Sequence, residues 1–233
     1  MISLVVPAYN EEKGIALFVE QVSQRITLKE PFEMLVVNDG STDATLKILE
    51  ELKEKHKHLR VVSHEHNKGL GMALYTGFQN AKGRIIVTTD ADMTHPPETI
   101  AKMAEKIDSG YDLCIGSRYV PGGGMENVPY WRILLSRVAN FFFALLFFCR
   151  ISDLTSGFRA YRSDAIRKIR IAESGFAVQL EITVKMLKQK ARITEVPFVL
   201  INRKIGASKF NFIRMSPVYF FTALKLFFYR WFG

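Results

Sequence analysis

The sequence predicts an α/β fold in which a mostly parallel sheet is covered by helices on both faces. Three observations lead to this expectation. Short apolar runs rich in Val and Ile alternate with longer, charge-bearing segments from Ile2 to Ser117. The chain has 233 residues, 48% of them hydrophobic, so it can bury a sizeable core. Polar residues follow the apolar runs directly, at the end of the strand where such sheets bind ligands.

Strands and helices are expected to alternate through the first half of the chain. The apolar runs predict strands at 2–7, 32–38, 59–64, 84–89 and 112–117. The segments between them predict helices at 11–26, 42–55, 68–81 and 97–107. Because a helix follows each strand, neighbouring strands are expected to run parallel.

Four polar clusters follow predicted strands. They are PAYNE at 7–11, NDGS at 38–41, DAD at 90–92 and GSR at 116–118. In a parallel sheet these positions share one edge, so the clusters are expected to converge. Three of them contain carboxylates, which a purely structural domain has no need to gather there. The sequence therefore predicts a ligand site at this edge.

Asp90 and Asp92 follow a buried strand and are separated by a single residue. Two carboxylates this close repel each other unless something positive lies between them. Their oxygens suit Mg²⁺ or Mn²⁺, which would join the pair to a diphosphate. The alternative is a solvated turn, since many surface loops carry a D-x-D sequence by chance.

Asp39 ends the second predicted strand and can accept hydrogen bonds from the edge of a nucleobase. The alternative is helix capping, because Ser41, Thr42 and Asp43 lead into the next predicted helix. Both roles are compatible if Asp43 caps the helix and Asp39 binds.

The second half changes character after the turn-rich segment 121–124. A helix is expected at 131–149, with Arg132, Ser136, Arg137 and Asn140 on one polar arc and aromatic residues elsewhere. Such a helix fits a membrane interface, and the alternative is a helix of the core. Its apolar run, 141–149, is well short of the ~20 residues that cross a bilayer.

A second aromatic helix is expected near the C-terminus. It would begin at the cap Ser216 with Pro217 in the first helical position, and continue as VYFFTALKLFFYRWF. Aromatic and basic residues together favour the headgroup zone of a membrane. The sequence therefore predicts a protein that lies on a membrane surface, and the alternative is a chain that stops where a membrane segment would begin.

The formal net charge is +9, from 32 Lys and Arg against 23 Asp and Glu, which suggests a polyanionic partner. Solubility alone is the alternative. No helix-turn-helix, RNP or zinc signature accompanies the charge, so nucleic acid is not expected as a partner. His56, His58, His64 and His66 are expected on the solvated surface, not in a metal cluster.

Several sequence blocks follow one another in the first half, namely VVPAYNEE, VVNDGSTDAT, NKGLGMALYTGFQNAKG, TTDADMTHPPE and IGSRYVPGG. Together, these blocks resemble family 2 glycosyltransferases with the GT-A (Rossmann-like) fold. Later blocks are similar to dolichol-phosphate mannose synthases and related polyprenyl-phosphate glycosyltransferases, namely ENVPYWRILLSRVANF, SDLTSGFRAYRSDAI, GFAVQLEITVK and VPFVLINRKIGASKF. The match runs from about Ile2 to Phe210 in the family's order.

The resemblance implies one catalytic domain over 1–233, with C-terminal amphipathic interface helices. Within it, 1–120 would form the nucleotide-sugar half, 121–210 the acceptor half with the helix 131–149, and 211–233 a membrane-proximal helix.

The resemblance also implies roles for individual residues. Nucleotide-sugar binding falls to Pro7, Tyr9, Glu11, Asp39, Asp90 and Ala91. Asp90 and Asp92 would bind Mg²⁺ or Mn²⁺, and the catalytic residues would be Asp92, Arg203 and Lys209. Arg118, Arg132 and Ser136 would hold the acceptor phosphate. The alternative for the arginines is solvated surface charge.

Three positions depart from the family pattern. Asn38 replaces the first of two aspartates, Ala207 replaces a common glutamate, and Thr94 stands where relatives often have glutamine. Whether Thr94 contributes a third ligand to the metal therefore stays open.

The implied activity is metal-dependent, inverting transfer of mannose from GDP-mannose to dolichyl or another polyprenyl phosphate. It would take place on the cytoplasmic face of a membrane, where a small membrane subunit could be a partner. Alternatives are a glucosyltransferase that uses UDP-glucose, a transferase with a saccharide acceptor, and a catalytically silent subunit. A saccharide acceptor is disfavoured because Gln179 begins QLEIT and not the usual Q-x-x-R-W.

Overall fold

The computed structural model describes residues 1–201 and 212–232, the segment 212–216 by its backbone only. In chain order the strands are β1 (Ile2–Ala8), β2 (Phe32–Asn38), β3 (Leu59–Ser63), β4 (Ile85–Thr88), β5 (Leu113–Ser117), β6 (Gly124–Glu126), β7 (Arg159–Arg162), β8 (Ile193–Pro197) and β9 (Val199–Ile201). The helices are α1 (Ile15–Arg25), α2 (Thr45–Lys55), α3 (Leu70–Asn80), α4 (Thr99–Asp108), α5 (Tyr130–Leu146), α6 (Ser163–Ile166), α7 (Val178–Lys188) and α8 (Phe212–Phe232).

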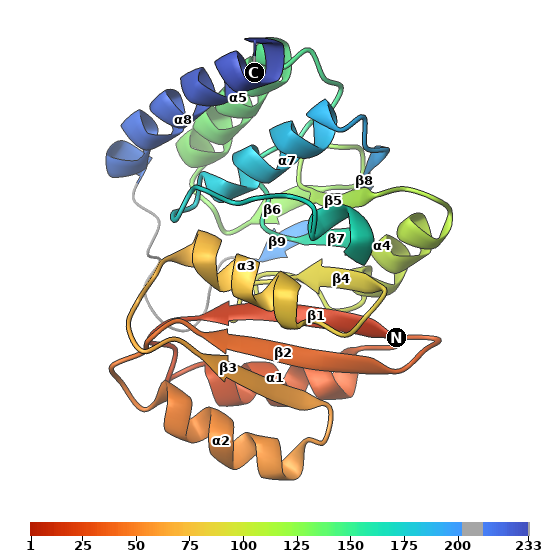
Figure 1. Cartoon of the computed structure of the whole chain (residues 1–233), viewed down its shortest axis with the longest axis vertical. Helices are drawn as coiled ribbons and strands as arrows, with labels where there is room; N and C mark the ends of the chain where they lie inside the picture. The colour runs from red at the N-terminus through yellow and green to blue at the C-terminus, as the bar shows by residue number, and fades with distance from the viewer. Residues whose placement is uncertain (202–211, 233) are drawn as a thin grey trace.

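Seven strands form one sheet in the order β3-β2-β1-β4-β7-β5-β8 (Figure 1). β1 pairs in parallel with β2 and with β4, β2 pairs in parallel with β3, and β5 pairs in parallel with β8. β7 lies between β4 and β5 and runs antiparallel to both. The expected mostly parallel sheet with flanking helices is therefore confirmed. β6 and β9 make a separate parallel pair.

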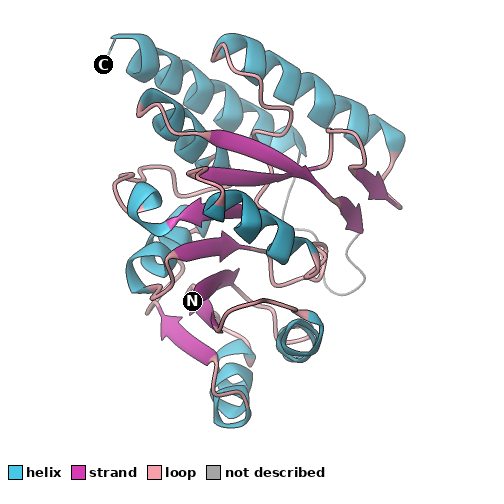
Figure 2. Cartoon of the chain, turned by 90° about the vertical axis from the view of Figure 1, so that its right-hand side faces the viewer, coloured by secondary structure: helices cyan, strands magenta, loops and turns pink. Residues whose placement is uncertain are grey.

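The two faces of the sheet are covered by different helices, which lie on both sides of the stacked strands in Figure 2. Side chains alternate along β1, so Leu4 and Val6 pack with α1, α2 and α4, whereas Val5 packs with α3 and α7 on the opposite face. α3 approaches β1 closely at Gly77, where a Cβ would lie only 2.3 Å from Val5 Cγ1.

The predicted strands and helices of the first half are all present, with small shifts at their ends. α1 begins at Ile15, four residues after the expected start. Asn10 adopts a left-handed backbone conformation, with φ of 51°. The backbone N–H groups of Asn10 and Glu11 donate to the side chains of Ser41 and Thr45, at 3.0 and 2.8 Å. These bonds hold 7–11 as a loop at the sheet edge, so the helix starts later.

The two aromatic helices α5 and α8 lie side by side, at the top of Figure 1. A ring contact between Phe143 and Tyr219 joins them, and Phe148, just after α5, contacts Trp231 of α8. α5 ends at Leu146, earlier than the expected 149, because Phe148 takes a left-handed φ of 47°. α8 begins at Phe212 and contains Pro217, so the expected start at Ser216 is wrong. Among the described residues, no helix is both long and apolar enough to cross a membrane.

Candidate active site

A cavity of about 1530 Å³ opens at the carboxyl ends of the strands. Every site residue expected from the sequence within the described segments lines it. These residues are Pro7, Tyr9, Glu11, Asp39, Asp90, Ala91, Asp92, Arg118, Arg132 and Ser136. Arg203 and Lys209 lie outside the described residues. The fold thus brings together clusters that are up to 129 positions apart in the chain, from Pro7 to Ser136.

Asp39 is buried at the end of β2, and its carboxylate ties β2 to the start of α3. Oδ1 accepts the backbone N–H of Lys68 and Oδ2 that of Gly69, each at 2.9 Å. The ring of His64 lies 2.6 Å from Oδ1 through Nδ1, and its Nε2 lies 2.9 Å from Thr76 Oγ1. The side chain of His64 is only 7% exposed, so the expectation of a solvated histidine is wrong here. An ionised carboxylate has further lone pairs, so Asp39 retains capacity to accept from a ligand.

The D-x-D loop is held by its own neighbours. Thr94 donates to Asp92 Oδ1 through its backbone N–H at 3.1 Å and its hydroxyl at 2.7 Å. Asp90 is half exposed, and its backbone N–H donates to His95 Nδ1 at 3.3 Å. The two aspartates therefore lie on a turn that is held in place by its own hydrogen bonds.

His95 is buried and stabilises this turn. Its ring stacks on Phe158 at 4.7 Å with planes 6° apart and meets Phe198 edge-on. Burial lowers the pKa of His95 to about 4, so the ring is neutral at pH 7. Because Nδ1 accepts the N–H of Asp90, and also lies 3.0 Å from the hydroxyl oxygen of Thr89, the ring proton is placed on Nε2, which lies 4.0 Å from Asp90 Oδ2.

The residues of this loop fit a hard divalent cation completed by substrate. Among the described residues, no group of three or more His, Cys, Asp or Glu side chains is arranged to hold a metal. Asp90 and Asp92 supply two carboxylates at the cavity wall. That donor set suits Mg²⁺, which is commonly bound by one or two carboxylates together with substrate phosphates and water. The hydroxyl of Thr94 is directed at Asp92 in this structure.

Arg118 forms a buried ion pair at the cavity wall. Its Nε and Nη2 donate to the two carboxylate oxygens of Asp153 at 2.7 and 2.6 Å, and its backbone N–H also donates to Asp153. Burial acts to lower the pKa of Arg118, but the carboxylate of Asp153 outweighs it and the pKa is raised. Arg118 therefore keeps its charge with one edge of the guanidinium held in place.

α5 brings the remaining polar residues to the same side. Arg132, Ser136 and Asn140 follow one another at four-residue spacing and all line the cavity. Asn140 is buried and exchanges hydrogen bonds with Thr155, accepting its backbone N–H at 3.2 Å and donating to its hydroxyl at 3.1 Å. Thr155 also accepts from Arg118 at 3.2 Å. Arg132, Ser136 and Asn140 of the expected polar arc therefore face the cavity, whereas Arg137 is not among its lining residues.

Beyond the arginines the cavity wall becomes apolar. α5 and α8 supply this part through Phe142, Phe143, Leu146, Tyr219, Phe220, Ala223, Leu224 and Phe227. The cavity therefore passes from carboxylates, through arginines, to an aromatic channel between two helices. A ligand that is polar at one end and hydrocarbon at the other matches this order.

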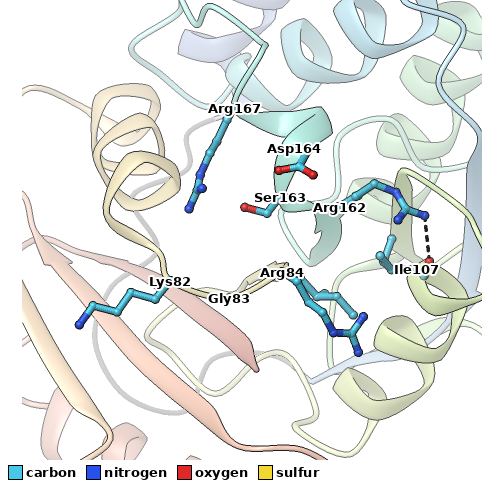
Figure 3. Close-up of a pocket in the computed structure, with 9 residues that line it drawn as sticks. Lys82, Gly83, Arg84, Ile107, Arg162, Ser163, Asp164 and Arg167 are labelled. Carbon is cyan, nitrogen blue, oxygen red and sulfur yellow. Dashed lines mark hydrogen bonds between the residues drawn. The ribbon is translucent and has the colours of Figure 1, made fainter.

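A second, smaller cavity of about 320 Å³ lies at the amino end of β4 (Figure 3). It contains several cations, but the protein already uses them. Arg84 pairs with Glu30 and Asp108, and Arg162 donates to the Ile107 carbonyl at 3.3 Å. Arg167 donates to the carbonyl groups of Phe78 and Ala81. Its position away from the carboxyl ends of the strands and the pairing of its three arginines make it a structural feature.

Sequence reasoning did not single out His64, His95 and Asp153. Each is hydrogen-bonded to a predicted site residue: His64 to Asp39, His95 to Asp90, and Asp153 to Arg118. His95 lies three positions after Asp92, which is a local signal that could have found it. Asp153 is 35 positions from Arg118, and only the fold brings the two together.

Comparison with known families identifies the class of protein. The family model described as "Glycosyl transferase family 2" matches residues 3–170. The chain belongs to this family, and it is a glycosyltransferase.

Individual relatives show which glycosyltransferases the chain is similar to. The chain is 35% identical over 215 residues to a polyprenol monophosphomannose synthase from Mycolicibacterium smegmatis, covering 89% of this chain and 80% of the relative. It is 36% identical over 210 residues to a dolichol-phosphate mannosyltransferase from Pyrococcus furiosus. That match covers 89% of this chain and 58% of the longer relative.

The fold is also similar to a solved structure, glucosyl-3-phosphoglycerate synthase from Mycobacterium tuberculosis. The TM-score is 0.74 at 21% identity, covering 97% of this chain and 79% of that one. Its crystal holds Mn²⁺, UDP-glucose and phosphoglyceric acid. At this identity the similarity concerns the fold alone, and it supports the GT-A architecture.

Proposed function

We propose that this protein transfers mannose from GDP-mannose to the phosphate of a polyprenyl phosphate, with inversion at the anomeric carbon. The observation that carries the proposal is the single cavity that joins Asp90 and Asp92 to Arg132 and Ser136 and then to the apolar channel of α5 and α8. The names of the relatives support mannose and a polyprenyl acceptor.

The donor would bind at the sheet edge. Pro7, Tyr9, Glu11 and Asp39 would hold the base and ribose, while Asp90, Ala91 and Asp92 would lie along the diphosphate. Asp90 and Asp92 would hold Mg²⁺ or Mn²⁺. The cation supplies positive charge to the departing diphosphate when it is bound. Arg203 and Lys209, assigned from the sequence, would add charge on the same group.

The acceptor would bind at the basic side. Arg118, Arg132 and Ser136 would hold its phosphate, and its hydrocarbon chain would lie in the channel between α5 and α8. A phosphate oxygen is already anionic at neutral pH, so it needs no general base to attack. The new bond forms from this oxygen to the anomeric carbon while the bond to the nucleoside diphosphate breaks. Positioning of the two reactants provides the remaining rate enhancement.

The outer surface of α5 and α8 supports attachment to a membrane. Large apolar side chains there are more than half exposed. On α5 they are Tyr130, Phe141 and Leu145, with Phe148 just after its end, and on α8 they are Phe221, Phe228 and Phe232. An aromatic patch of this kind marks an interaction surface, and aromatic residues favour the bilayer interface. The acceptor would then enter the channel from the lipid, on the cytoplasmic side.

The test is sugar transfer to a short polyprenyl phosphate in detergent, with GDP-mannose or UDP-glucose as donor and Mg²⁺ or Mn²⁺ present. Lipid-linked product from GDP-mannose that disappears with EDTA is expected. Product from UDP-glucose alone would keep the mechanism and change the sugar. No lipid product from either donor, with a folded protein and metal present, would overturn the proposed acceptor.

A further inference from the structure

The residues proposed to hold the acceptor phosphate come from two separate elements. Arg118 follows β5 and is held by Asp153, whereas Arg132 and Ser136 lie on α5. A phosphate bound by both groups requires them to lie at a set distance from each other. The contact that fixes α5 against the segment 153–155 therefore decides how well the two groups fit one phosphate.

Asn140 is the buried residue of α5. The structure describes the whole of this helix, and among its 17 residues only Asn140 is buried, with 1% of its surface exposed. The other residues, most of them apolar, are half buried or exposed. Apolar packing has little direction, so a helix held by it alone can shift or rotate. A single buried asparagine can fix one arrangement, as it does in coiled coils.

The amide of Asn140 contacts Thr155 at two points. Oδ1 accepts the backbone N–H of Thr155 at 3.2 Å, and Nδ2 donates to the Thr155 hydroxyl at 3.1 Å. Nδ2 also donates to the carbonyl group of Ser136, one turn earlier in α5, at 2.9 Å. A backbone N–H only donates, so it must face Oδ1, which determines how the amide is turned. Asn140 thus joins the turn that carries Ser136 to the loop at Thr155.

The hydroxyl of Thr155 connects Asn140 to Arg118. Its oxygen accepts from Arg118 Nη2 at 3.2 Å as well as from Asn140 Nδ2. The hydroxyl is directed at Asp153 Oδ1, 3.5 Å away. A hydroxyl has two acceptor lone pairs and one proton, so these three contacts use its full capacity. One buried chain of hydrogen bonds therefore runs from α5 to the guanidinium of Arg118.

We propose that Asn140 is a positioning residue for the acceptor phosphate. Through Thr155 it sets where the polar residues of α5 lie relative to Arg118. This inference rests on the proposed function. A misplacement of about 1 Å at a reacting group can lower the rate roughly a hundredfold, so a small shift of α5 would be felt in catalysis. The residues proposed to bind the donor lie at the ends of other elements, so the effect is expected on the acceptor alone.

The substitution Asn140→Leu keeps the approximate size of the side chain and removes both bonds to Thr155. We expect the acceptor kcat/KM to fall at least about tenfold while the KM for GDP-mannose stays near wild type. Both are measured by transfer to a short polyprenyl phosphate in detergent, with the melting temperature recorded in parallel. Unchanged acceptor kinetics in Asn140→Leu would overturn the inference.

Ala144→Gly is the matched control on the same helix. Ala144 is half buried and is not among the residues that line the cavity. Glycine weakens a helix, so this variant loosens α5 without changing the amide of Asn140. Its acceptor kcat/KM should stay near wild type. A loss as large as that of Asn140→Leu would show that α5 needs only general stability, which would overturn the inference.

A double variant with Arg132→Ala distinguishes positioning from loss of structure. If Asn140 acts by placing Arg132, the substitution Asn140→Leu should lower the acceptor kcat/KM by a much smaller factor once Arg132 is absent. Independent effects multiply, so the same factor in both backgrounds would overturn the inference.

Thr155 keeps the inference testable if Asn140→Leu does not fold. Thr155→Val preserves the shape and the backbone N–H and removes the hydroxyl, whereas Thr155→Ser preserves the hydroxyl. The serine variant should retain a clearly higher acceptor kcat/KM than the valine variant, and equal values would overturn the inference. With an active wild type, these outcomes leave the proposed function standing. A wild type that transfers no sugar to lipid would overturn the proposed function and this inference with it.

Discussion

Arg118 and Asp153 form a bidentate ion pair with N···O distances of 2.6 and 2.7 Å, although 35 positions separate them in the chain. The side chain of Asp153 is fully buried, and that of Arg118 is 15% exposed at the cavity wall. The pair leaves Arg118 charged and oriented, which is what a phosphate-binding arginine requires.

Asp153→Asn should reveal both consequences of this pair. Removing one partner leaves a buried charge unpaired, which is expected to cost about 3 kcal/mol of unfolding free energy, measured by urea denaturation. The KM for acceptor should rise. Adding Arg118→Gln should recover part of the stability but not the acceptor KM, because the phosphate ligand is then lost. Glu105→Gln, which breaks the exposed pair with Lys29, is the control and should cost less than about 1 kcal/mol. A double variant with normal acceptor KM would show that the pair is only structural.

Asp92→Ala should remove most turnover and leave the fold intact. The side chain lines the cavity and is bonded by Thr94, so its loss removes a charge from the site without opening the core. Binding of Mn²⁺ in the presence of GDP, followed by electron paramagnetic resonance, should weaken at the same time. Asp164→Ala, an exposed aspartate at the smaller cavity, is the control. Near-normal turnover and Mn²⁺ affinity in Asp92→Ala would contradict the metal role.

His95→Phe should separate packing from positioning of Asp90. Phenylalanine keeps the stacking on Phe158 but cannot accept the backbone N–H of Asp90. We expect a small change in melting temperature and a fall in kcat of roughly tenfold, the cost of one unmade hydrogen bond. His95→Asn restores an acceptor and should recover more activity than His95→Phe despite a lower stability. Equal activity in the two variants would mean that the bond to Asp90 does not matter.

Arg132→Ala should act mainly on the acceptor. Arg132 lies on the cavity side of α5. Arg137 lies on the same helix but is not among the cavity-lining residues, and its guanidinium lies 5.5 Å from the ring centre of Tyr119. Each of the two alanine variants removes one positive charge from the same helix. Comparing their steady-state kinetics therefore tests whether the position of that charge matters. We expect a raised acceptor KM in Arg132→Ala and near wild-type values in Arg137→Ala. The same acceptor KM in both variants would show that Arg132 acts through its charge in general and makes no specific contact with the phosphate.

Local patterns predicted much of this structure because they report on local physics. The runs ISLVVP and FEMLVVN are buried on both faces of a parallel sheet, so they read as unbroken apolar segments. The strand ends could be placed for the same reason, and with them Asp39, Asp90 and Asp92. β7 does not show this pattern, because its sequence RAYR begins and ends with arginine and is not an unbroken apolar run.

Contacts that depend on tertiary structure could not be read from the sequence. The guanidinium of Arg159 is satisfied by main-chain carbonyl groups and a threonine hydroxyl, none of which has a sequence signature. His64 lies in a polar segment and becomes buried only because Asp39 and Thr76 close around it. The side-chain amide of Gln179 likewise lies near Asp90 only once α7 packs beside Gly157.

The exposed aromatic surface of α5 and α8 predicts a measurable affinity for lipid. Phe141 is 67% exposed on α5 and Phe221 is 66% exposed on α8, and neither is among the residues that line the cavity. Fully burying one exposed phenylalanine contributes about 1.5–3 kcal/mol, and about two thirds of each side chain is available to bury, so Phe141→Ser with Phe221→Ser should lower binding to anionic phospholipid vesicles by roughly thirtyfold or more. Vesicle co-sedimentation measures this.

Transfer to a short acceptor in detergent should remain near wild type, because the active-site residues are unchanged. Leu17→Ser, at an exposed position on α1, is the matched control and should bind vesicles normally. Wild-type vesicle affinity in the double variant would exclude this surface as the membrane contact.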